Sequence, residues 1–524
     1  MRKLSTLFCA VLMTLSAMAT DYKGNLTVSI NGEGSTQPAT ISIVENAGKY
    51  NLSILNFMLG EGESVLPVGN IVIENVTGAV AGNLTTLYVN KNITIQKGNV
   101  AGIADDAWLG PMLGEVPVKM SSSFNTNGFL GVNIDIDMVS TLGQVIKVTF
   151  ENVGNHFQMP NSDFETWSNE NNAPKHWHGF ESVKGKLSGT AKSKTKLVSS
   201  KNVRPGSKGL TSAVVTSTKV FTVIANGTMT NGVLNAGSMY AADASNHSET
   251  DLSSTSKDAN GDPFATPMYA KPDSVKFWMR FTQAKAQASY PYAAFNAVIT
   301  DSTYYQDPEN KTYTNKVAVA APNKADMTVG DWRLVSCPFD YASYAANGAE
   351  AKAILLTVST NATPGKGSYS NGVADSVYVD DLELVYLADI KSVSFKGATL
   401  DLTNTDIDIA DDDVISASDF VVEKIGEDAK VTTLVEANAK GYQAVISVVS
   451  GDLNTQKTLV FNFNKPVWAD GDVNHDGVVD LADVTLLINK VLGADATQLY
   501  NPDVNADGKV DVADVTTLVS LILG

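Results

Sequence analysis

Short runs in which apolar and polar residues alternate follow one another along most of the chain, to about residue 463. Alternation with a period of two predicts β-strands that bury one face. Up to residue 153 there are eight such runs, separated by turn sequences such as Asn31-Gly32 and Lys97-Gly98. The runs are 26–30, 41–43, 52–55, 71–73, 87–89, 93–95, 132–136 and 146–150. Eight strands at short intervals predict a β-sandwich or a barrel.

In the middle of the chain the alternation also assigns side chains to faces. The run 274–281 predicts a strand whose core face carries Val275, Phe277, Met279 and Phe281. Lys276, Trp278 and Arg280 then share the opposite face. A tryptophan is less expected on a charged face. It either stacks on a glycan, with the two basic residues beside it, or lies under a covering loop.

The pattern changes towards the end of the chain. Residues 388–465 contain further short strand-like runs, and their number fits a small immunoglobulin-like sandwich. After them, apolar residues in 484–492 and 515–523 recur with the spacing i, i+3, i+4, i+7, i+8. This spacing predicts two amphipathic helices, ended by Gly493 and Gly524.

Each predicted helix follows an acidic loop, and the two loops are 31 residues apart. Both match an EF-hand-like loop at positions 1, 3, 5, 6, 9 and 12. Ca²⁺ takes about six to eight oxygen ligands, glycine at position 6 permits the sharp turn, and position 7 contributes only its backbone carbonyl. The expected ligands of two Ca²⁺ ions are Asp472, Asn474, Asp476, Val478, Asp480, Asp483, Asp503, Asn505, Asp507, Lys509, Asp511 and Asp514.

A loop followed by a helix, present twice with aspartate at position 12, resembles the type I dockerin family over about residues 470–524. The resemblance implies a cohesin-like protein partner that meets the helix surface next to the loops. Cellulosomal dockerins often carry a Ser/Thr pair at loop positions 10 and 11. Here these positions are Leu481-Ala482 and Val512-Ala513. This departure leaves open whether the module attaches to another protein or docks on a neighbouring domain.

Two further resemblances concern the β domains. The strand order before residue 153 resembles calycin-like (lipocalin-like) barrels of exported Bacteroidota proteins, which implies either a small apolar ligand or a barrel filled by its own side chains. The motifs N-x-D-F-E-x-W at 161–167, P-x-x-W at 174–177 and V-D-D-L-x-L at 379–384 resemble a Bacteroidota domain assigned to carbohydrate metabolism, and jelly-roll carbohydrate-binding modules.

The expected fold class is therefore mainly all-β and multi-domain, with a small α-helical calcium-loop module at the C-terminus. The first segment has the features of a signal peptide, with Arg2 and Lys3 before an apolar stretch at 7–15 and a cleavage site at 17–19. The expected parts are a signal peptide at 1–19, a calycin-like barrel at 20–153, a jelly-roll domain at 154–387, a β-sandwich spacer at 388–465 and a dockerin-like module at 466–524.

Export implies a periplasmic, cell-surface or extracellular location. Cys9 lies too early in the leader for lipidation at the cleavage site, and Cys337 alone cannot form a disulfide within the mature chain. Hydrophobic residues make up 44% of the chain, which is typical of a globular protein. The formal net charge is −18, most of it after residue 390, and this disfavours nucleic acid and anionic lipid as partners. After the leader, no apolar segment reaches the ~20 residues that a membrane-spanning helix needs.

Four acids form a second candidate metal site. The first and last strands of a jelly roll are neighbours, which would bring Asp163 and Glu165 close to Asp380 and Asp381. Such carboxylates repel one another unless a cation joins them. They are therefore expected to hold a structural Ca²⁺, or to end strands in water. A glycosidase pair is a third reading, but it requires a defined carboxyl separation that sequence does not supply.

Two smaller features favour structural roles. His176 and His178 would share one strand face, as a transition-metal pair or as the polar side of an edge strand. Asp258 begins a D-x-N-x-D sequence, but Pro263 replaces the loop glycine, which indicates a polar turn.

The expected function is glycan binding without catalysis, by an exported protein with a calcium-dependent attachment module. No catalytic residue is assigned, and Ca²⁺ is the only expected cofactor. The alternatives are a glycoside hydrolase or other polysaccharide-processing enzyme with a dockerin tail, and a structural scaffold tethered through a cohesin-like partner.

Overall fold

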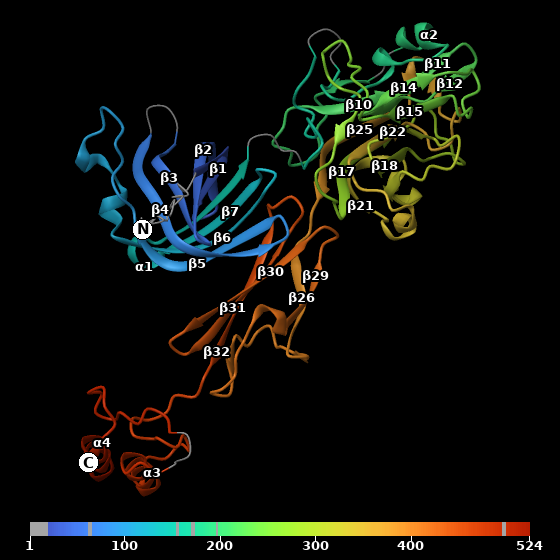
Figure 1. Cartoon of the computed structure of the whole chain (residues 1–524). Helices are drawn as coiled ribbons and strands as arrows, with labels where there is room; N and C mark the ends of the chain where they lie inside the picture. The colour runs from blue at the N-terminus through green and yellow to red at the C-terminus, as the bar shows by residue number, and fades with distance from the viewer. Residues whose placement is uncertain (1–18, 61–64, 153–156, 169–172, 195–196, 495–498) are drawn as a thin grey trace, which may run out of the picture. The chain divides into compact units, whose positions relative to one another are not determined.

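The structure is a computed structural model of the chain and describes residues 19–60, 65–152, 157–168, 173–194, 197–494 and 499–524 (Figure 1). Almost all of the expected signal peptide, with Cys9, lies outside the described residues. The described residues form two compact units. One contains residues up to 392 with 422–432 and 446–458, and the other contains 393–421, 433–445 and 459–524. Strands predominate, so the mainly all-β fold class is confirmed.

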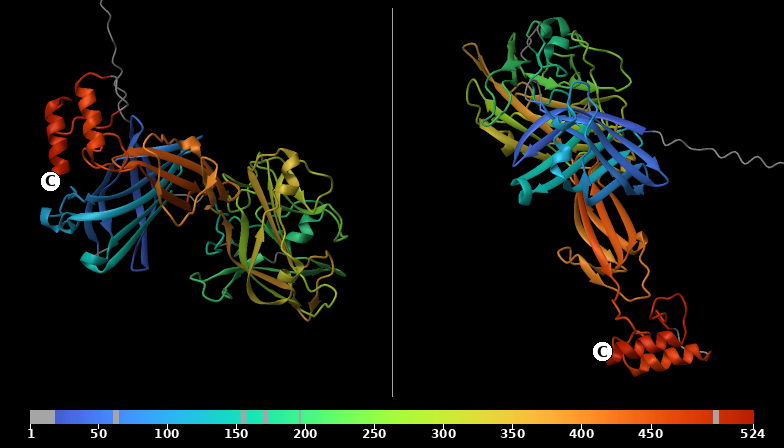
Figure 2. Two further views of the ribbon diagram at one scale, coloured as in Figure 1. Left: turned by 90° about the horizontal axis from the view of Figure 1, so that it is seen from below. Right: turned by 90° about the vertical axis from the view of Figure 1, so that its left-hand side faces the viewer.

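An eight-stranded antiparallel barrel occupies the N-terminal part of the chain (Figures 1 and 2). Each strand pairs with the next, and β1 closes the barrel by pairing with β8. Alternate side chains fill the interior, as the period-two pattern predicts, and Leu52, Ile73 and Met120 are fully buried there. The elements are β1 (Ala19–Ile30), β2 (Glu33–Asn46), β3 (Lys49–Leu59), β4 (Leu66–Ala81), β5 (Leu84–Thr94), β6 (Glu115–Asn125), β7 (Leu130–Met138), α1 (Val139–Leu142) and β8 (Gln144–Asn152).

The eight runs in the sequence do not correspond one to one to these strands. The runs 87–89 and 93–95 belong largely to one long strand, β5, whereas β6 has no counterpart among the runs. β6 contains Pro117 and three successive serines, which weaken the strand signal in sequence. Its place between β5 and β7 supplies the backbone partners on both sides.

Closure of the barrel depends on Gly24. This residue of β1 lies opposite Asn152 of β8, and a Cβ atom there would collide with the Glu151 carbonyl oxygen and lie 2.6 Å from Cζ of Phe150. Gly24→Ala is expected to lower the free energy of unfolding of the barrel by about 1–3 kcal/mol, because the packed seam must move apart.

Gly34→Ala is the matched control for urea unfolding of the two variants. A Cβ at Gly34 would make only ordinary contacts, the nearest at 3.6 Å, so a change within about 0.5 kcal/mol is expected. Equal losses in the two variants would contradict the role of the β1–β8 seam.

Residues 157–387 contain two antiparallel sheets that enclose one core (Figure 1). The core face predicted for 274–281 is confirmed, since Val275, Phe277, Met279 and Phe281 are all fully buried. The first sheet has the order β21 (Gly330–Pro338), β17 (Ser274–Thr282), β25 (Ser376–Val385), β10 (Ser212–Thr216) and β9 (Leu197–Ser200). The second has the order β13 (Thr228–Thr230), β22 (Ala353–Ser359), β18 (Ala294–Thr300) and β20 (Lys316–Ala320), with β16 (Thr266–Pro267) also on β22.

Smaller elements surround this sandwich. A three-stranded sheet contains β14 (Val233–Ala236), β15 (Asn246–Thr250) and β19 (Tyr305–Asp307). Two hairpins are formed by β11 (Thr218–Val220) with β12 (Val223–Ala225), and by β23 (Tyr369–Ser370) with β24 (Val373–Ala374). A short helix, α2 (Ser188–Lys192), lies nearby in the fold and contacts β14.

The part after residue 388 has two small sheets and then two helices. The sheets have the orders β27-β26-β29 and β28-β32-β31-β30. The alternating runs in this part of the sequence are 393–395, 420–422, 442–448 and 459–463, so β27, β28 and β30 have no counterpart among them. The elements are β26 (Asp389–Phe395), β27 (Ala398–Thr399), β28 (Asp406–Asp408), β29 (Phe420–Ile425), β30 (Lys430–Asn438), β31 (Gly441–Val449), β32 (Gln456–Asn464), α3 (Leu481–Val491) and α4 (Val512–Leu523).

The two predicted helices are confirmed, and α3 and α4 lie side by side (Figure 2). Their shared core contains Val484, Leu487 and Leu518, together with Val473 from the first loop. Leu492 and Leu523, which belong to the predicted apolar faces, are instead largely exposed at the helix ends. No helix in the described part of the chain is long and apolar enough to cross a membrane.

Candidate functional site

The first acidic loop is held together by carboxylates at its two ends. Asp472 accepts hydrogen bonds from the backbone N–H groups of Asp476 and Gly477, at 3.2 and 3.0 Å. Asp483, at the other end, accepts from the N–H groups of Asn474 and Asp480, at 3.1 and 2.9 Å. Backbone N–H groups of the loop therefore hold the carboxylates at positions 1 and 12 inside the loop.

The second loop repeats this arrangement bond for bond. Asp503 accepts from Asp507 and Gly508, and Asp514 accepts from Asn505 and Asp511, over distances of 2.8–3.1 Å. The amide bonds hold the pKa of Asp514 below its usual value, the bond from Asp511 having the largest effect. The sequence repeat is thus a repeat of three-dimensional structure.

Glycine is required at position 6 by the backbone. Gly477 and Gly508 have φ angles of 89° and 87°, a region that other residues rarely adopt. The position-4 residues, His475 and Ala506, are both left-handed with φ of 57°. The sharp turn expected from the glycine is therefore present in both loops.

The residues present fit Ca²⁺. All the side chains expected to act as ligands offer hard oxygen donors, which this ion prefers. In the first loop Asp472 and Asp483 are 3% and 0% exposed, and neither makes an ion pair among the described residues. A buried carboxylate without a positive partner is costly, and a bound cation would offset that cost. When bound, the ion would supply positive charge and fix the loop.

Counting only His, Cys, Asp and Glu side chains, no three in the described residues gather around a point that could hold a metal. In each loop the carboxylates are instead held by the loop amides, and the remaining expected donors are an Asn oxygen and a backbone carbonyl. The assignment of individual ligands in the two loops stays a prediction.

The acid at position 9 has a further role that sequence reasoning missed. Asp480 is the N-cap of α3 and accepts from the Ala482 N–H at 2.7 Å, and Asp511 does the same for α4 with Ala513 at 2.8 Å. With Asp483 and Asp514 three residues later, each forms a reciprocal capping box. The D-x-x-D spacing before an apolar run is the sequence signal that could have predicted these capping boxes.

A stack of three aromatic rings lies beside the first loop. The His475 ring is 4.5 Å from that of Trp468 and 3.9 Å from that of Tyr500, and both pairs are nearly parallel. Trp468 precedes the loop and Tyr500 follows α3, so the stack ties both flanks of the loop to it. The second loop has Ala506 at the corresponding position and cannot form such a stack.

The four acids of the candidate structural site have their own partners. The Leu382 N–H donates to the Ser162 carbonyl at 2.9 Å, so the two acidic segments are adjacent. Arg204 supplies positive charge there, because its Nε donates to Asp381 and its backbone N–H donates to Asp380 at 3.0 Å. Glu165 accepts from Leu210 and Thr211. The geometry gives no support to a structural Ca²⁺ at Asp163, Glu165, Asp380 and Asp381, which stays a prediction.

Asp380 should make the stability of the sandwich depend on pH. It is fully buried, one of its oxygens has no hydrogen-bond partner, and burial raises its pKa to about 6. The folded state therefore binds the proton more tightly than the unfolded state, and stability falls as pH rises from about 4 to 6. Asp380→Asn is expected to remove this loss, on the order of 1–3 kcal/mol, in urea unfolding at pH 4 and pH 7. An unchanged pH dependence in the variant would contradict the assignment.

The candidate glycan-stacking residues are already engaged. The Arg204 guanidinium lies over the Trp278 ring, 5.3 Å from its centre. Lys276 pairs with Glu383 at 2.8 Å, and Arg280 pairs with Asp331 at 3.3 Å. Trp278 is half-buried on this face of the sheet. Glycan binding by Trp278, Lys276 and Arg280 stays a prediction that would require displacement of Arg204.

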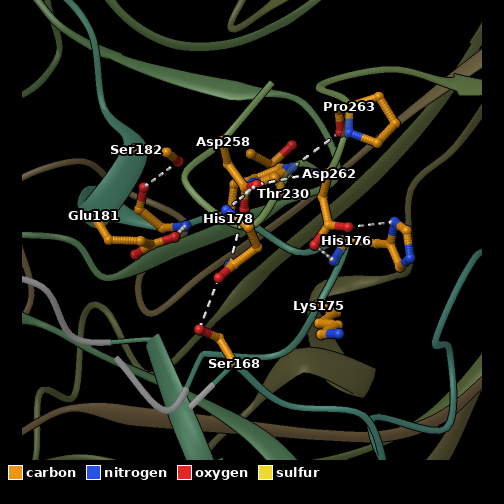
Figure 3. Close-up of polar contacts among 12 residues, drawn as sticks. Ser168, Lys175, His176, His178, Glu181, Ser182, Thr230, Asp258, Asp262 and Pro263 are labelled. Atoms are coloured by element: carbon orange, nitrogen blue, oxygen red, sulfur yellow. Dashed lines mark hydrogen bonds and ion pairs between the residues drawn. The ribbon is translucent and has the colours of Figure 1, made fainter. Parts of the chain in front are cut away.

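The structure brings the pair His176 and His178 next to the D-x-N-x-D sequence that begins at Asp258, although the two are far apart in the chain (Figure 3). His178 is fully buried, and its Nδ1 is 3.7 Å from Asp258, while His176 lies 3.5 Å from Asp262. Nε2 of His178 lies 3.1 Å from the Pro263 carbonyl, and its backbone pairs with Thr230. Burial lowers the pKa of His178, which favours its neutral form. The D-x-N-x-D segment is a turn that packs against the histidines, as a structural element of the core.

The loops and helices of the C-terminal part define a calcium-loop docking module attached to β domains. Residues 470–523 match the family described as Dockerin type I domain, and residues 18–153 match the family described as Calycin-like beta-barrel domain. The chain therefore carries a calycin-like domain in its N-terminal part and a type I dockerin domain in its C-terminal part. Dockerin type I domains generally bind calcium, and they dock on cohesin-type partners.

No curated protein matches the chain. Among solved structures, a provisionally assigned outer membrane protein of Bacteroides fragilis is 11% identical, with 65% of this chain and 96% of that chain covered and a TM-score of 0.18. The mosquito-larvicidal Cry4Aa toxin of Bacillus thuringiensis is 8% identical, with 70% and 52% covered and a TM-score of 0.15. PNGF-II is 9% identical, with 71% and 69% covered and a TM-score of 0.13. Scores this low carry no argument about function.

Proposed function

We propose that this chain is an exported, non-catalytic glycan-binding protein that attaches to a cohesin-type partner through its calcium-loaded C-terminal module. The observation that carries the proposal is the pair of equivalent acidic loops, each leading into a capped helix. Two such loops in one small module are expected to fold around two Ca²⁺ ions, with the aspartates and asparagines of the loops and the position-7 carbonyls as ligands.

The surface beside the loops supports protein docking. Leu481 and Val512, the position-10 residues of the two loops, are 74% and 66% exposed. Exposed apolar residues next to polar loops are typical of interaction sites. Since the two residues occupy equivalent places, the module would offer two similar docking faces.

Docking is tested by pull-down of the intact chain with a recombinant type I cohesin, once in about 5 mM Ca²⁺ and once in chelator. This Ca²⁺ concentration exceeds the Kd expected of such loops. Retention only in Ca²⁺ is expected, with a loss of about tenfold or more for the double variant Leu481→Asp and Val512→Asp. Val467→Asp is the control, because Val467 is 91% exposed but precedes the first loop and the residues 470–523 that match the dockerin family. The proposal would be refuted if retention were the same in Ca²⁺ and in chelator and were unchanged in the double variant.

The glycan-binding half of the proposal is supported by the β-sandwich and by the motifs at 161–167, 174–177 and 379–384. Its test is retention of the intact chain on a glycan array, together with an assay for released reducing sugar. Retention without release is expected. Release that is lost on Asp163→Asn would instead establish a glycoside hydrolase.

A further inference from the structure

The sandwich contains a cavity of about 530 Å³ that the sequence did not suggest. Small-molecule sites commonly have about 300–1,000 Å³, so the space suits a ligand of one or two rings. The cavity lies over the second sheet and is bounded by α2, the β11–β12 hairpin and the β14–β15 pair. It is therefore on the opposite sheet from Trp278.

The floor of the cavity consists of outward-facing residues of β18 and β22. Alternation sends Phe295, Leu356 and Val358 into the core, which leaves Asn296, Thr357 and Ser359 on the other face. Farther along the same face, Val298 and Leu355 are covered by Tyr305 and Tyr313. The outer face of one sheet is thus divided into a covered apolar half and a polar half that lines the cavity.

Three polar atoms of the lining lack partners. The side-chain oxygen of Asn226 and the hydroxyls of Ser248 and Thr357 are buried and make no hydrogen bond among the described residues. The amide nitrogen of Asn226 is already used, as it donates to the Asn361 carbonyl at 2.7 Å. Unpaired buried polar atoms are unfavourable, and a ligand with hydroxyl groups would supply partners for them.

The chemistry of the lining selects a neutral ligand. The lining residues, all within the described part of the chain, include no lysine or arginine. His247 is among them but is paired with Glu249 at 2.9 Å, and Asp307 is the one carboxylate in this described lining. Amide and hydroxyl groups both donate and accept, which matches the hydroxyls of a sugar. Leu187, Val223 and Leu234 provide apolar walls for its C–H surfaces.

Two exposed aromatic residues are neighbours in sequence of residues that line the cavity. Phe221 is 77% exposed and lies between Val220 and Val223, which both line the cavity. Tyr240 is 82% exposed and lies between the lining residues Met239 and Ala241. Exposed rings of this kind are amphipathic platforms on which a flat sugar face can pack.

From the cavity, its unpaired polar atoms and the exposed aromatic residues next to its lining in sequence, we infer that the site binds one or two rings of a neutral saccharide, with Asn226 and Thr357 on its hydroxyls and Phe221 or Tyr240 against its C–H face. The inference rests on the proposed glycan-binding function and places it on the second sheet. Uronates and sulfated sugars would be disfavoured, because the lining, all of it within the described residues, offers no lysine or arginine to pair with their charge.

The test is calorimetric titration of the intact chain, in Ca²⁺, with galactose, N-acetylglucosamine, lactose and cellobiose, and with digalacturonic acid as the charged probe. Thr357→Val, which removes one hydroxyl at constant shape, and Tyr240→Ala are each expected to weaken binding of a neutral sugar about tenfold. Trp278→Ala, on the other sheet, should leave the affinity unchanged, and digalacturonic acid should not bind.

The outcomes separate the cavity from the wider proposal. Binding that Thr357→Val and Tyr240→Ala leave intact, or that Trp278→Ala abolishes, would overturn the cavity assignment while glycan binding stands. Tighter binding of digalacturonic acid than of the neutral sugars would also overturn it. Retention of no glycan on the array and no heat with any probe would overturn the glycan-binding function itself.

Discussion

Removal of calcium from the intact chain is expected to unfold the C-terminal module and to leave the β domains folded. Among the residues of the module that the structure describes, four apolar side chains form the fully or nearly fully buried core, which is small for two helices. The ligands converge only in the folded loop, so that binding energy becomes folding energy. At a free Ca²⁺ concentration a thousand times Kd, one site adds about 4 kcal/mol of stability.

Hydrogen exchange of the intact chain measures this directly. Amides in α3 and α4 are expected to lose protection by a factor of about a hundred or more in chelator, whereas those in β17 keep theirs. Mg²⁺ at the same concentration should restore much less protection, because it favours a smaller octahedral site.

Single substitutions distinguish the contribution of each loop to the calcium-dependent protection. Asp483→Ala and Asp514→Ala each remove a buried carboxylate from one loop, and each is expected to abolish the calcium-dependent protection of its own helix. Asp470→Ala is the control, because Asp470 is exposed and precedes the first loop. Protection in α3 and α4 that does not change between calcium and chelator would refute a metal-dependent module.

Phe277→Ala is expected to destabilise the middle sandwich by about 3–5 kcal/mol. Phe277 is fully buried in β17, and its ring stacks on Phe295 of β18, with centres 4.1 Å apart and planes 16° apart. The two rings therefore join the two sheets across the core. Truncation would remove both the buried area and the stacking contact, and would leave a cavity.

The measurement is urea unfolding followed by tryptophan fluorescence, for which this region provides Trp167, Trp177, Trp278 and Trp332. Lys276→Ala, one residue earlier on the same strand, removes only a half-exposed ion pair with Glu383 and should change stability by less than about 1 kcal/mol. Comparable losses in the two variants would contradict the division of β17 into a core face and an outer face.

Local periodicity was enough to predict the type of most elements. The alternation in β17 assigned its buried face because side chains of a strand alternate strictly between the two sides of a sheet. It could not reveal β6, whose proline and serines weaken the pattern and whose pairing depends on β5 and β7. It also divided β5 into two runs.

The candidate sites show the same limit. Arg204 is 176 residues from Asp380 in the chain. No local pattern indicates that Arg204 supplies the positive charge that the sequence leads us to expect from a Ca²⁺ ion beside Asp380. His178 and Asp258 likewise meet only through folding. The cavity is formed by residues from 180 to 365, each unremarkable in its own segment.

The sequence by itself determined the mainly β fold class, the two helices and the two acidic loops, because strand alternation, helical spacing and loop ligands are patterns of near neighbours. The tertiary structure alone decided the closing seam of the barrel, the partners of the buried acids and the cavity over the second sheet. These depend on which distant segments pack together, and that is set by the fit of whole surfaces rather than by any short run of residues.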